Sequence, residues 1–379
     1  MNKTALHERH RQLGAKMTEF HGWEMPLYYT SILEEHRAVR QALGLFDVSH
    51  MGQVLVTGPD ARATLARLLT SDITQVAPGR ACYTLLLNES GGILDDLIVY
   101  HLDEEAYLVI VNCATHEQDV AWLTRHAQGR TTIADISEGR AIVSVQGPLA
   151  CRVLEQVLDA RVTTLGRFGV APIRTMGPDA CLARTGYTGG DGFELFLANR
   201  HAQKLWDLLL ASAKPMGILP IGLGARDTLR IEAGLRLYGT DMDAATTPLE
   251  AGLEWVLAMG KPDFIGKAAL EAQKAQGLTR KFAAFELSHG PVPRTGAELF
   301  TLEGSALRKV GAVTSGTFSP ILNKPLGMGY VEPALTAPGT VLTLVVRAQR
   351  YAATVVKLPF WKGEARQPAL TETTTKRVH

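Results

Sequence analysis

Cysteines are scarce in this chain and stand far from one another. There are four, at positions 82, 113, 151 and 181, and no two of them form a CxxC pair. This spacing argues against both a zinc knuckle and a disulfide framework. Cys82 and Cys113 lie in apolar, strand-like text, which is typical of buried, inert thiols rather than nucleophiles. We therefore expect reduced thiols, as in a cytoplasmic protein.

Long apolar runs and an excess of charge are also missing. No uncharged apolar stretch approaches the roughly 18 to 20 residues that a membrane span needs, and the first residues, MNKTALHERHRQLGAKM, are polar. Lys and Arg total 39 against 38 for Asp and Glu, a formal net charge of +1. Such a balance gives no general attraction for nucleic acid or for an anionic membrane. We expect a cytoplasmic protein that binds neither, in which any recognition of an anion is local.

Three familiar ligand motifs are incomplete. The glycines of GKPDFIGKA enclose five residues where a P-loop has four, and Ala268 stands where Ser or Thr would hold magnesium. The run GLGARD, from Gly222, lacks the third glycine of a dinucleotide fingerprint. His50, in DVSHMG, has no second histidine at ligand spacing. The sequence therefore predicts no nucleotide phosphate cradle, no nicotinamide or flavin site, and no metal.

Length and patterning predict several domains. The 379 residues, 46% of them apolar, exceed what one hydrophobic core organises. Helix-like and strand-like segments are intermixed without strict βαβ alternation, which indicates an α+β fold with mostly antiparallel sheets. Ser31 and Glu34 form a capping-box pattern that predicts a helix over Ser31–Leu43. After residue 281 the runs predict an all-strand domain with a long loop, GTFSPILNKPLGMGY, inside it.

The segment RTGYTGGDGFELF, residues 184–196, combines glycines with an aromatic ring and two carboxylates. Its glycines allow positive φ and a close approach of the backbone to a ligand. Tyr187 supplies a flat ring, while Asp191 and Glu194 supply carboxylates. The segment is compatible with a clamp for a planar molecule that donates hydrogen bonds. It is equally compatible with a glycine-rich hairpin whose Glu194 faces water.

A second segment, NESGGILDDLIVYH, carries adjacent aspartates in strand-like text. Side chains alternate along a strand, so Asp96 and Tyr100 share one face while Asp95 shares the other with Leu97 and Val99. A partly desolvated aspartate beside a tyrosine could serve as a general acid or an electrostatic group. Taken alone, the segment favours a strand entry with both carboxylates solvated.

A third segment, GLGARDTLRIEAGLRLYG, predicts a helix that begins near Ala225. The i, i+4 spacing brings Arg226 and Arg230 onto one face, and Asp227 suits the helix N-terminus. Arg226 could hold a carboxylate ligand through its bidentate fork. A structural pair with Asp or Glu is almost as compatible.

Together these segments resemble the aminomethyltransferase family, the T-protein of the glycine cleavage system, over about residues 4 to 362. Two further runs carry the same resemblance, LGAKMTEFHGWEMPLYYTSILEEHRAVRQALGLFDVSHMG and VTSGTFSPILNKPLGMGYV. The resemblance implies an α+β fold, a three-domain cloverleaf of mixed αβ units with mostly antiparallel sheets and a C-terminal β-barrel-like domain. The expected parts are a discontinuous folate-binding αβ domain (residues 1–50 and 139–245) and an inserted αβ domain that carries the catalytic aspartate (51–138). A connecting helical segment (246–278), a C-terminal β domain (279–365) and a flexible tail (366–379) follow.

The resemblance also implies the reaction and its participants. The aminomethyl carbon on the lipoyl arm of H-protein is transferred to tetrahydrofolate, giving 5,10-methylenetetrahydrofolate, ammonia and dihydrolipoyl H-protein. The implied partners are lipoylated H-protein and, functionally, the glycine decarboxylase and dihydrolipoyl dehydrogenase components. Asp96 matches the catalytic aspartate. The implied folate-binding residues are Tyr83, Tyr100, Tyr187, Glu194, Arg226 and Met51, with Lys362 or Arg366 as candidates for holding the glutamyl tail.

The chemistry of these residues fits the resemblance. A pterin presents a ring NH and an exocyclic amine side by side, and one carboxylate such as Glu194 can accept both. Asp96 could stabilise the positive charge that develops as ammonia leaves, or it could relay a proton at the attacking nitrogen. Two other functions stay open, a folate-dependent demethylase of the same fold and a non-catalytic folate-binding module. Retention of both Asp96 and RTGYTGGDGFELF argues against the module.

Overall fold

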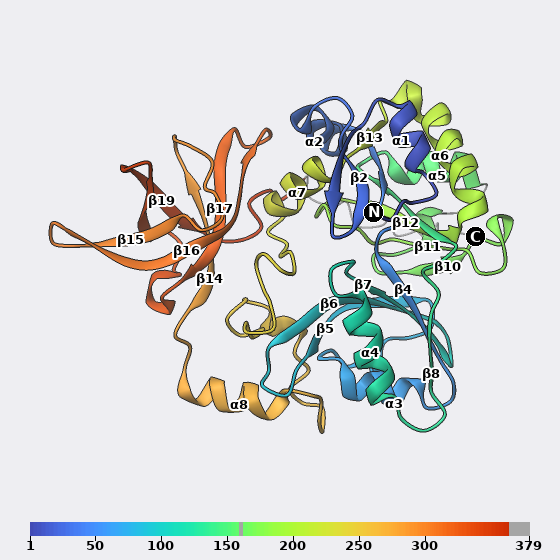
Figure 1. Ribbon diagram of the computed structural model, residues 1–379, viewed down its shortest axis with the longest axis horizontal. Helices are drawn as coiled ribbons and strands as arrows, with labels where there is room; N and C mark the ends of the chain where they lie inside the picture. Colours follow the sequence, from blue (N-terminus) through green and yellow to red (C-terminus); the bar gives the residue numbers. More distant parts are fainter. Residues whose placement is uncertain (159–161, 364–379) are drawn as a thin grey trace, which may run out of the picture.

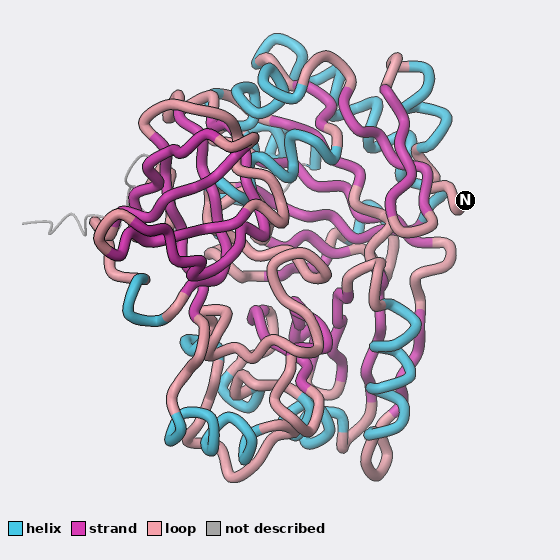
Figure 2. Tube along the Cα trace, turned by 60° about the vertical axis from the view of Figure 1, so that its left-hand side comes forward, coloured by secondary structure: helices cyan, strands magenta, loops and turns pink. Residues whose placement is uncertain are grey.

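The computed structural model describes residues 1–158 and 162–363, which form three lobes around a common centre (Figure 1). Two lobes mix helices with mostly antiparallel sheets, and the third is a closed barrel. In Figure 2 the barrel lobe consists almost entirely of strands, whereas helices lie along the outer sides of the other two lobes. The predicted α+β cloverleaf is confirmed. No helix in the described parts of the chain is long and apolar enough to cross a membrane.

The first lobe contains a six-stranded sheet in the order β10-β11-β12-β9-β3-β13. Only β13 runs parallel to its neighbour, β3. The strands are β3 (Gly44–Asp47), β9 (Arg140–Gln146), β10 (Val170–Pro172), β11 (Cys181–Ala183), β12 (Gly192–Ala198) and β13 (Leu219–Ile221). The helices are α1 (His7–Gln12), α2 (Ile32–Gln41), α5 (Ala150–Leu158), α6 (Asn199–Ala213) and α7 (Leu223–Glu232), and a hairpin of β1 (Lys16–Phe20) and β2 (Trp23–Tyr28) lies beside them.

Helix α2 begins as its capping box predicts. The Ser31 hydroxyl accepts from the main-chain N–H of Glu34 at 3.2 Å and donates to the Glu34 carboxylate at 3.1 Å. The predicted end at Leu43 is wrong by two residues, since the helix ends at Gln41. Gly44 is instead the first residue of strand β3, because residues 44–47 are all buried in the sheet.

The second lobe is a five-stranded antiparallel sheet in the order β5-β6-β7-β4-β8. Its elements are β4 (Gly52–Thr57), α3 (Ala61–Leu68), β5 (Arg80–Leu87), β6 (Ile93–Asp103), β7 (Ala106–Val111), α4 (His116–His126) and β8 (Thr132–Asp135). Leu97 and Val99 of β6 are buried in the core of this lobe. Their neighbours Asp96, Ile98 and Tyr100 line a cavity, so the predicted alternation along this strand is confirmed.

The barrel closes in the order β14-β17-β16-β15-β18-β19, and β19 pairs back onto β14. Its strands are β14 (Lys281–Leu287), β15 (Glu298–Glu303), β16 (Ala306–Ser319), β17 (Lys324–Val331), β18 (Val341–Val346) and β19 (Gln349–Val356), preceded by helix α8 (Lys267–Gln276).

The predicted long loop GTFSPILNKPLGMGY is wrong, because these residues form the β16–β17 hairpin of the barrel. Its glycines are needed for close packing rather than for a loop. A Cβ on Gly327 would lie 2.3 Å from the ring of Phe285, and one on Gly329 would lie 2.2 Å from the carbonyl oxygen of Ala312. Glycine in a strand can therefore mark a close approach between neighbouring segments.

Candidate active site

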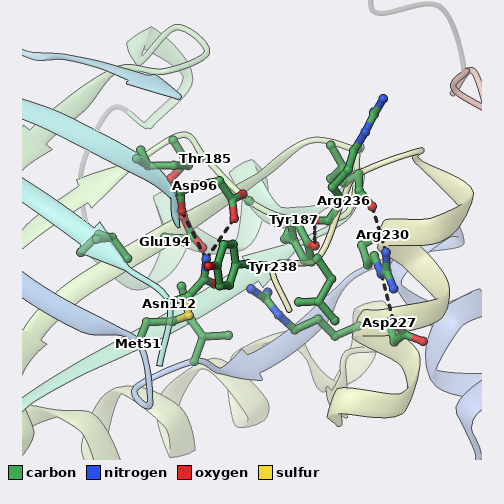
Figure 3. Close-up of a pocket in the computed structure, with 18 of the residues that line it drawn as sticks. Met51, Asp96, Asn112, Thr185, Tyr187, Glu194, Asp227, Arg230, Arg236 and Tyr238 are labelled. Carbon is green, nitrogen blue, oxygen red and sulfur yellow. Dashed lines mark hydrogen bonds and ion pairs between the residues drawn. The ribbon is translucent and has the colours of Figure 1, made fainter. Parts of the chain in front are cut away.

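A cavity of about 1770 Å³ lies where the three lobes meet. All three contribute to its wall, for example Asp96 from the second lobe, Arg226 from α7 and Ser315 from the barrel. Seven of the predicted site residues line it, namely Met51, Tyr83, Asp96, Tyr100, Tyr187, Glu194 and Arg226. Figure 3 shows several of them together with Asn112 and Tyr238. Segments far apart in the sequence thus meet at one site.

Tyr100 physically joins the aspartate strand to the glycine-rich segment. Its side chain emerges from β6 on the same face as Asp96, and its hydroxyl lies 3.3 Å from Oε2 of Glu194 on β12. Thr185 completes the arrangement, with its hydroxyl 2.8 Å from that of Tyr100 and donating to Oε2 of Glu194 at 2.5 Å. Among the described residues, none donates to Oε1 of Glu194. The carboxylate is therefore fixed through one oxygen and keeps the other for a ligand.

Asp96 is held through both of its carboxylate oxygens. The hydroxyl of Tyr83 donates to Oδ2 at 3.1 Å, and the side-chain amide of Asn112 donates to Oδ1 at 3.0 Å. Burial, and then the neighbouring carboxylate of Asp95, raise the pKa of Asp96 against the lowering effect of the two donors, and the resulting pKa is about 7. A carboxyl group with this pKa exchanges a proton near neutral pH, as a general acid or base requires.

The three predicted tyrosines have different environments. The ring of Tyr83 stacks on Trp255 with a centroid distance of 5.6 Å and an interplanar angle of 19°, although Trp255 is 71% exposed. The hydroxyl of Tyr187 donates to the main-chain carbonyl of Arg236, which fixes the ring. Tyr100 is 1% exposed, so its main contribution is the support of Glu194. Tyr83 and Tyr187 are therefore better placed to contact a flat ligand.

Arginines bring positive charge to the cavity. The guanidinium of Arg226 lies 4.8 Å from the centre of the Tyr187 ring and is attracted by the charge of Glu194. Arg230, the other arginine on that face of α7, forms ion pairs with Asp227 and Asp241, so its role is structural. Arg236 donates to main-chain carbonyl oxygens of Gly234 and Ala251. Arg226 and Arg236 form no ion pair with any residue that the structure describes, so both can attract an anion.

Of the two candidates for holding the glutamyl tail, only Lys362 lies among the described residues. Lys362 is exposed and is absent from the cavity wall, and Arg366 lies outside the described residues. The adjacent Trp361 packs against the guanidinium of Arg40 at 3.8 Å and donates its main-chain N–H to the main-chain carbonyl oxygen of Glu232 at 3.0 Å. His50 lines the cavity and is 4% exposed, and burial lowers its pKa to about 4, so its imidazole is neutral. Within the described ranges, no group of three or more His, Cys, Asp or Glu side chains could hold a metal.

Sequence reasoning missed Asn112, Thr185, Arg236 and Trp255. Asn112 directly follows strand β7, and a polar residue at a strand end is a signal that could have been noticed. Thr185 stands inside the segment that drew attention for its glycines. No local signal marks Trp255 or Arg236, because their roles depend on how distant segments meet.

Comparisons with known proteins agree with this architecture. Residues 6–261 match the model of the GCVT N-terminal domain, and residues 280–362 match that of the glycine cleavage T-protein C-terminal barrel domain. An aminomethyltransferase of Halothermothrix orenii is 43% identical, over 95% of this chain and 100% of that protein. One of Geobacillus thermodenitrificans is 42% identical, over 96% of this chain and 99% of that protein.

A solved structure gives the same result in three dimensions. The crystal structure of the glycine cleavage system aminomethyltransferase T from Bartonella henselae superposes with a TM-score of 0.90 at 35% identity. The superposition covers 97% of this chain and 99% of that one. The matched family models span all three lobes that form the cavity, including the barrel. The chain belongs to the aminomethyltransferase family, the T-proteins of the glycine cleavage system.

Proposed function

We propose that this chain transfers the aminomethyl carbon from the lipoyl arm of H-protein to tetrahydrofolate, releasing ammonia and dihydrolipoyl H-protein and forming 5,10-methylenetetrahydrofolate. One observation carries the proposal. A carboxyl group with a pKa near neutrality, Asp96, shares a cavity with Glu194, a carboxylate fixed through one oxygen. The functional partners would be lipoylated H-protein and the decarboxylase and dihydrolipoyl dehydrogenase components, in the cytoplasm.

The residues at the cavity fit the shape and polarity of a reduced folate. Pockets that bind drug-sized ligands measure roughly 300 to 1,000 Å³, so a cavity of about 1770 Å³ can take folate and still admit a second reactant. Glu194 would accept the ring NH and exocyclic amine of the pterin. Tyr187 and Tyr83 offer ring faces, and Met51 adds an adaptable apolar contact. Arg226 would balance the charge of Glu194 or contact a polar atom of the ligand.

The proposed reaction moves two protons, and Asp96 would accept one of them. Two folate nitrogens each lose a proton when the methylene bridge forms. The lipoyl sulfur gains one of these protons and the departing amine gains the other. Asp96 would take a proton from the attacking nitrogen, and its negative charge would stabilise the positive charge that develops as ammonia leaves. Tyr83 and Asn112 fix the carboxylate, so it does not have to reorient during the reaction.

The direct test measures 5,10-methylenetetrahydrofolate formed from tetrahydrofolate and aminomethylated lipoyl H-protein, with and without this chain. We expect product that depends on both the chain and the aminomethylated carrier. H-protein carrying an unmodified lipoyl arm is the matched control and should give none. Absence of carrier-dependent product while tetrahydrofolate still binds would favour a demethylase that acts on a small methylated compound.

A further inference from the structure

A pair of neighbouring carboxyl groups lies behind the cavity, on the side of β6 opposite to Asp96. Asp95 of β6 and Asp119 of α4 are both completely buried, each 0% exposed. Each of these two carboxyl groups acts directly on the other. The ion pairs of this lobe join other groups, His116 with Asp135 and Arg130 with Asp60, in the part of the chain that the structure describes. No cation therefore balances two negative charges at this place.

Hydrogen-bond donors are divided unequally between the two carboxyls. Asp95 accepts from the main-chain N–H of Asn112 at 2.9 Å and from its side-chain amide at 2.7 Å. Within the described ranges, no group donates to either carboxylate oxygen of Asp119. The hydroxyl of Thr115 lies beside both carboxyls and lowers the pKa of each, while its hydrogen-bond geometry is to the carbonyl oxygen of Asn112, at 3.3 Å. Two ionised carboxylates only accept, so the contact becomes favourable when Asp119 carries a proton and donates it to Asp95.

Asn112 connects this pair to the reacting carboxyl. Its side-chain amide donates to Asp95 at 2.7 Å and to Asp96 at 3.0 Å. We propose that Asp95 and Asp119 share one proton and so place a single negative charge behind Asp96, which makes Asp95 a positioning residue for the reaction. The shared proton is a property of the fold, whereas the effect on catalysis rests on the proposed function of Asp96.

The titration behaviour of nearby groups supports this arrangement. Burial, and then the charge of Asp95, raise the pKa of Asp119 to about 10. The other titratable groups that interact with Asp95, Asp96 or Asp119 are Tyr83, Tyr187, Tyr238 and Cys113, and Asp243 interacts with Tyr238. Burial raises the pKa of Cys113 to about 11 and that of Tyr238 to about 12, so both stay neutral. Arg226, which interacts with Cys113, stays charged, so the change near neutrality belongs to the carboxyls.

Infrared spectroscopy tests the shared proton without any assay of activity. In mildly alkaline solution the folded protein should show the C=O stretching band of a protonated, buried carboxyl group. Asp119→Asn should lose that band, because the amide supplies the donor without an acidic proton. Asp96→Asn, the matched control, should keep it. Absence of the band from the unsubstituted protein, or its persistence in Asp119→Asn, would overturn the shared proton.

The pH dependence of turnover tests the effect on Asp96. Asp95→Asn removes the negative charge, so the acidic limb of the turnover profile should move down by about one pH unit. Asp119→Asn leaves the charge on Asp95, so the midpoint should stay in place. Asp103→Asn, at the exposed end of β6, controls for a nonspecific loss of one charge. Equal shifts in Asp95→Asn and Asp119→Asn would contradict the positioning role. A flat profile in the unsubstituted protein would instead contradict the proposed role of Asp96, and the infrared result would still stand.

Discussion

The hydroxyl of Tyr83 donates a hydrogen bond to Oδ2 of Asp96 at 3.1 Å. The two residues are diagonal neighbours on paired strands, since Tyr83 of β5 lies opposite Ile98 of β6, two residues after Asp96. Stacking on Trp255 fixes the ring from the other side. The catalytic candidate therefore has a rigid donor, and the ring that supplies it also forms part of the cavity wall.

Replacing Tyr83 by Phe should raise the pKa of Asp96, because the lost hydrogen bond favours the charged carboxylate. A hydrogen bond to a charged group contributes roughly 1.5 to 3 kcal/mol, so we expect the acidic limb of turnover to move up by about one to two pH units. Tyr351→Phe, on the barrel, is the control. An unchanged midpoint would show that this hydrogen bond does not influence the working carboxyl.

Turnover of the unsubstituted protein should rise with pH across about 7, which is the pKa of Asp96. The rate should increase with pH because the ionised carboxylate is the active form of Asp96. The carboxylate accepts the proton and stabilises positive charge, and it is lost when pH falls below the raised pKa. Initial rates at saturating substrates, with circular dichroism at each pH to confirm folding, provide the measurement. A rate that is constant from mildly acidic to mildly alkaline pH would exclude this assignment.

Glu194→Gln should weaken tetrahydrofolate binding while leaving the chemical step less affected. The amide keeps the size of the side chain but replaces one acceptor by a donor, which would oppose the NH groups of the pterin. The loss of a charged hydrogen bond corresponds to a rise of roughly ten- to a hundredfold in Kd. Fluorescence titration or calorimetry measures it, with Glu298→Gln on the barrel surface as control. Unchanged affinity would place the pterin elsewhere.

The capping box of α2 offers a test of stability apart from function. Ser31→Ala removes the bond to the main-chain N–H of Glu34, so the free energy of unfolding should fall by about 1 kcal/mol. Ser31→Asp should retain most of it, since Asp is also a good N-cap. Chemical denaturation of both variants gives the comparison. Equal losses in the two would mean that the cap contributes little to this helix.

Much of the local structure could be predicted from the sequence, because it depends on short-range rules. Alternation along β6 placed Asp96 and Tyr100 on one face, and the capping box placed the start of α2. Residues 316–330, predicted as a long loop, instead belong to the β16–β17 hairpin and contain several glycines. In the barrel they permit close packing against Phe285 and neighbouring backbone.

The convergence of the site depends on tertiary structure, which residue spacing does not encode. β12, which carries Glu194, pairs with β9 and β11 rather than with β6, so no strand register connects Glu194 to Asp96. Their proximity depends on packing between two lobes, through Tyr100 and Thr185. Asn112 was missed because its importance appears only when both aspartates are seen to share its amide.

Single-turnover kinetics of Asp96→Asn test the central claim most directly, namely that Asp96 performs the chemistry while Glu194 and its neighbours bind the pterin. Formation of 5,10-methylenetetrahydrofolate would be followed from aminomethylated lipoyl H-protein, and tetrahydrofolate affinity would be measured on the same preparation. We predict a rate lower by roughly two to four orders of magnitude with nearly unchanged affinity, since a positioned acid or base contributes about that much. A near-normal rate at saturating folate would contradict the account.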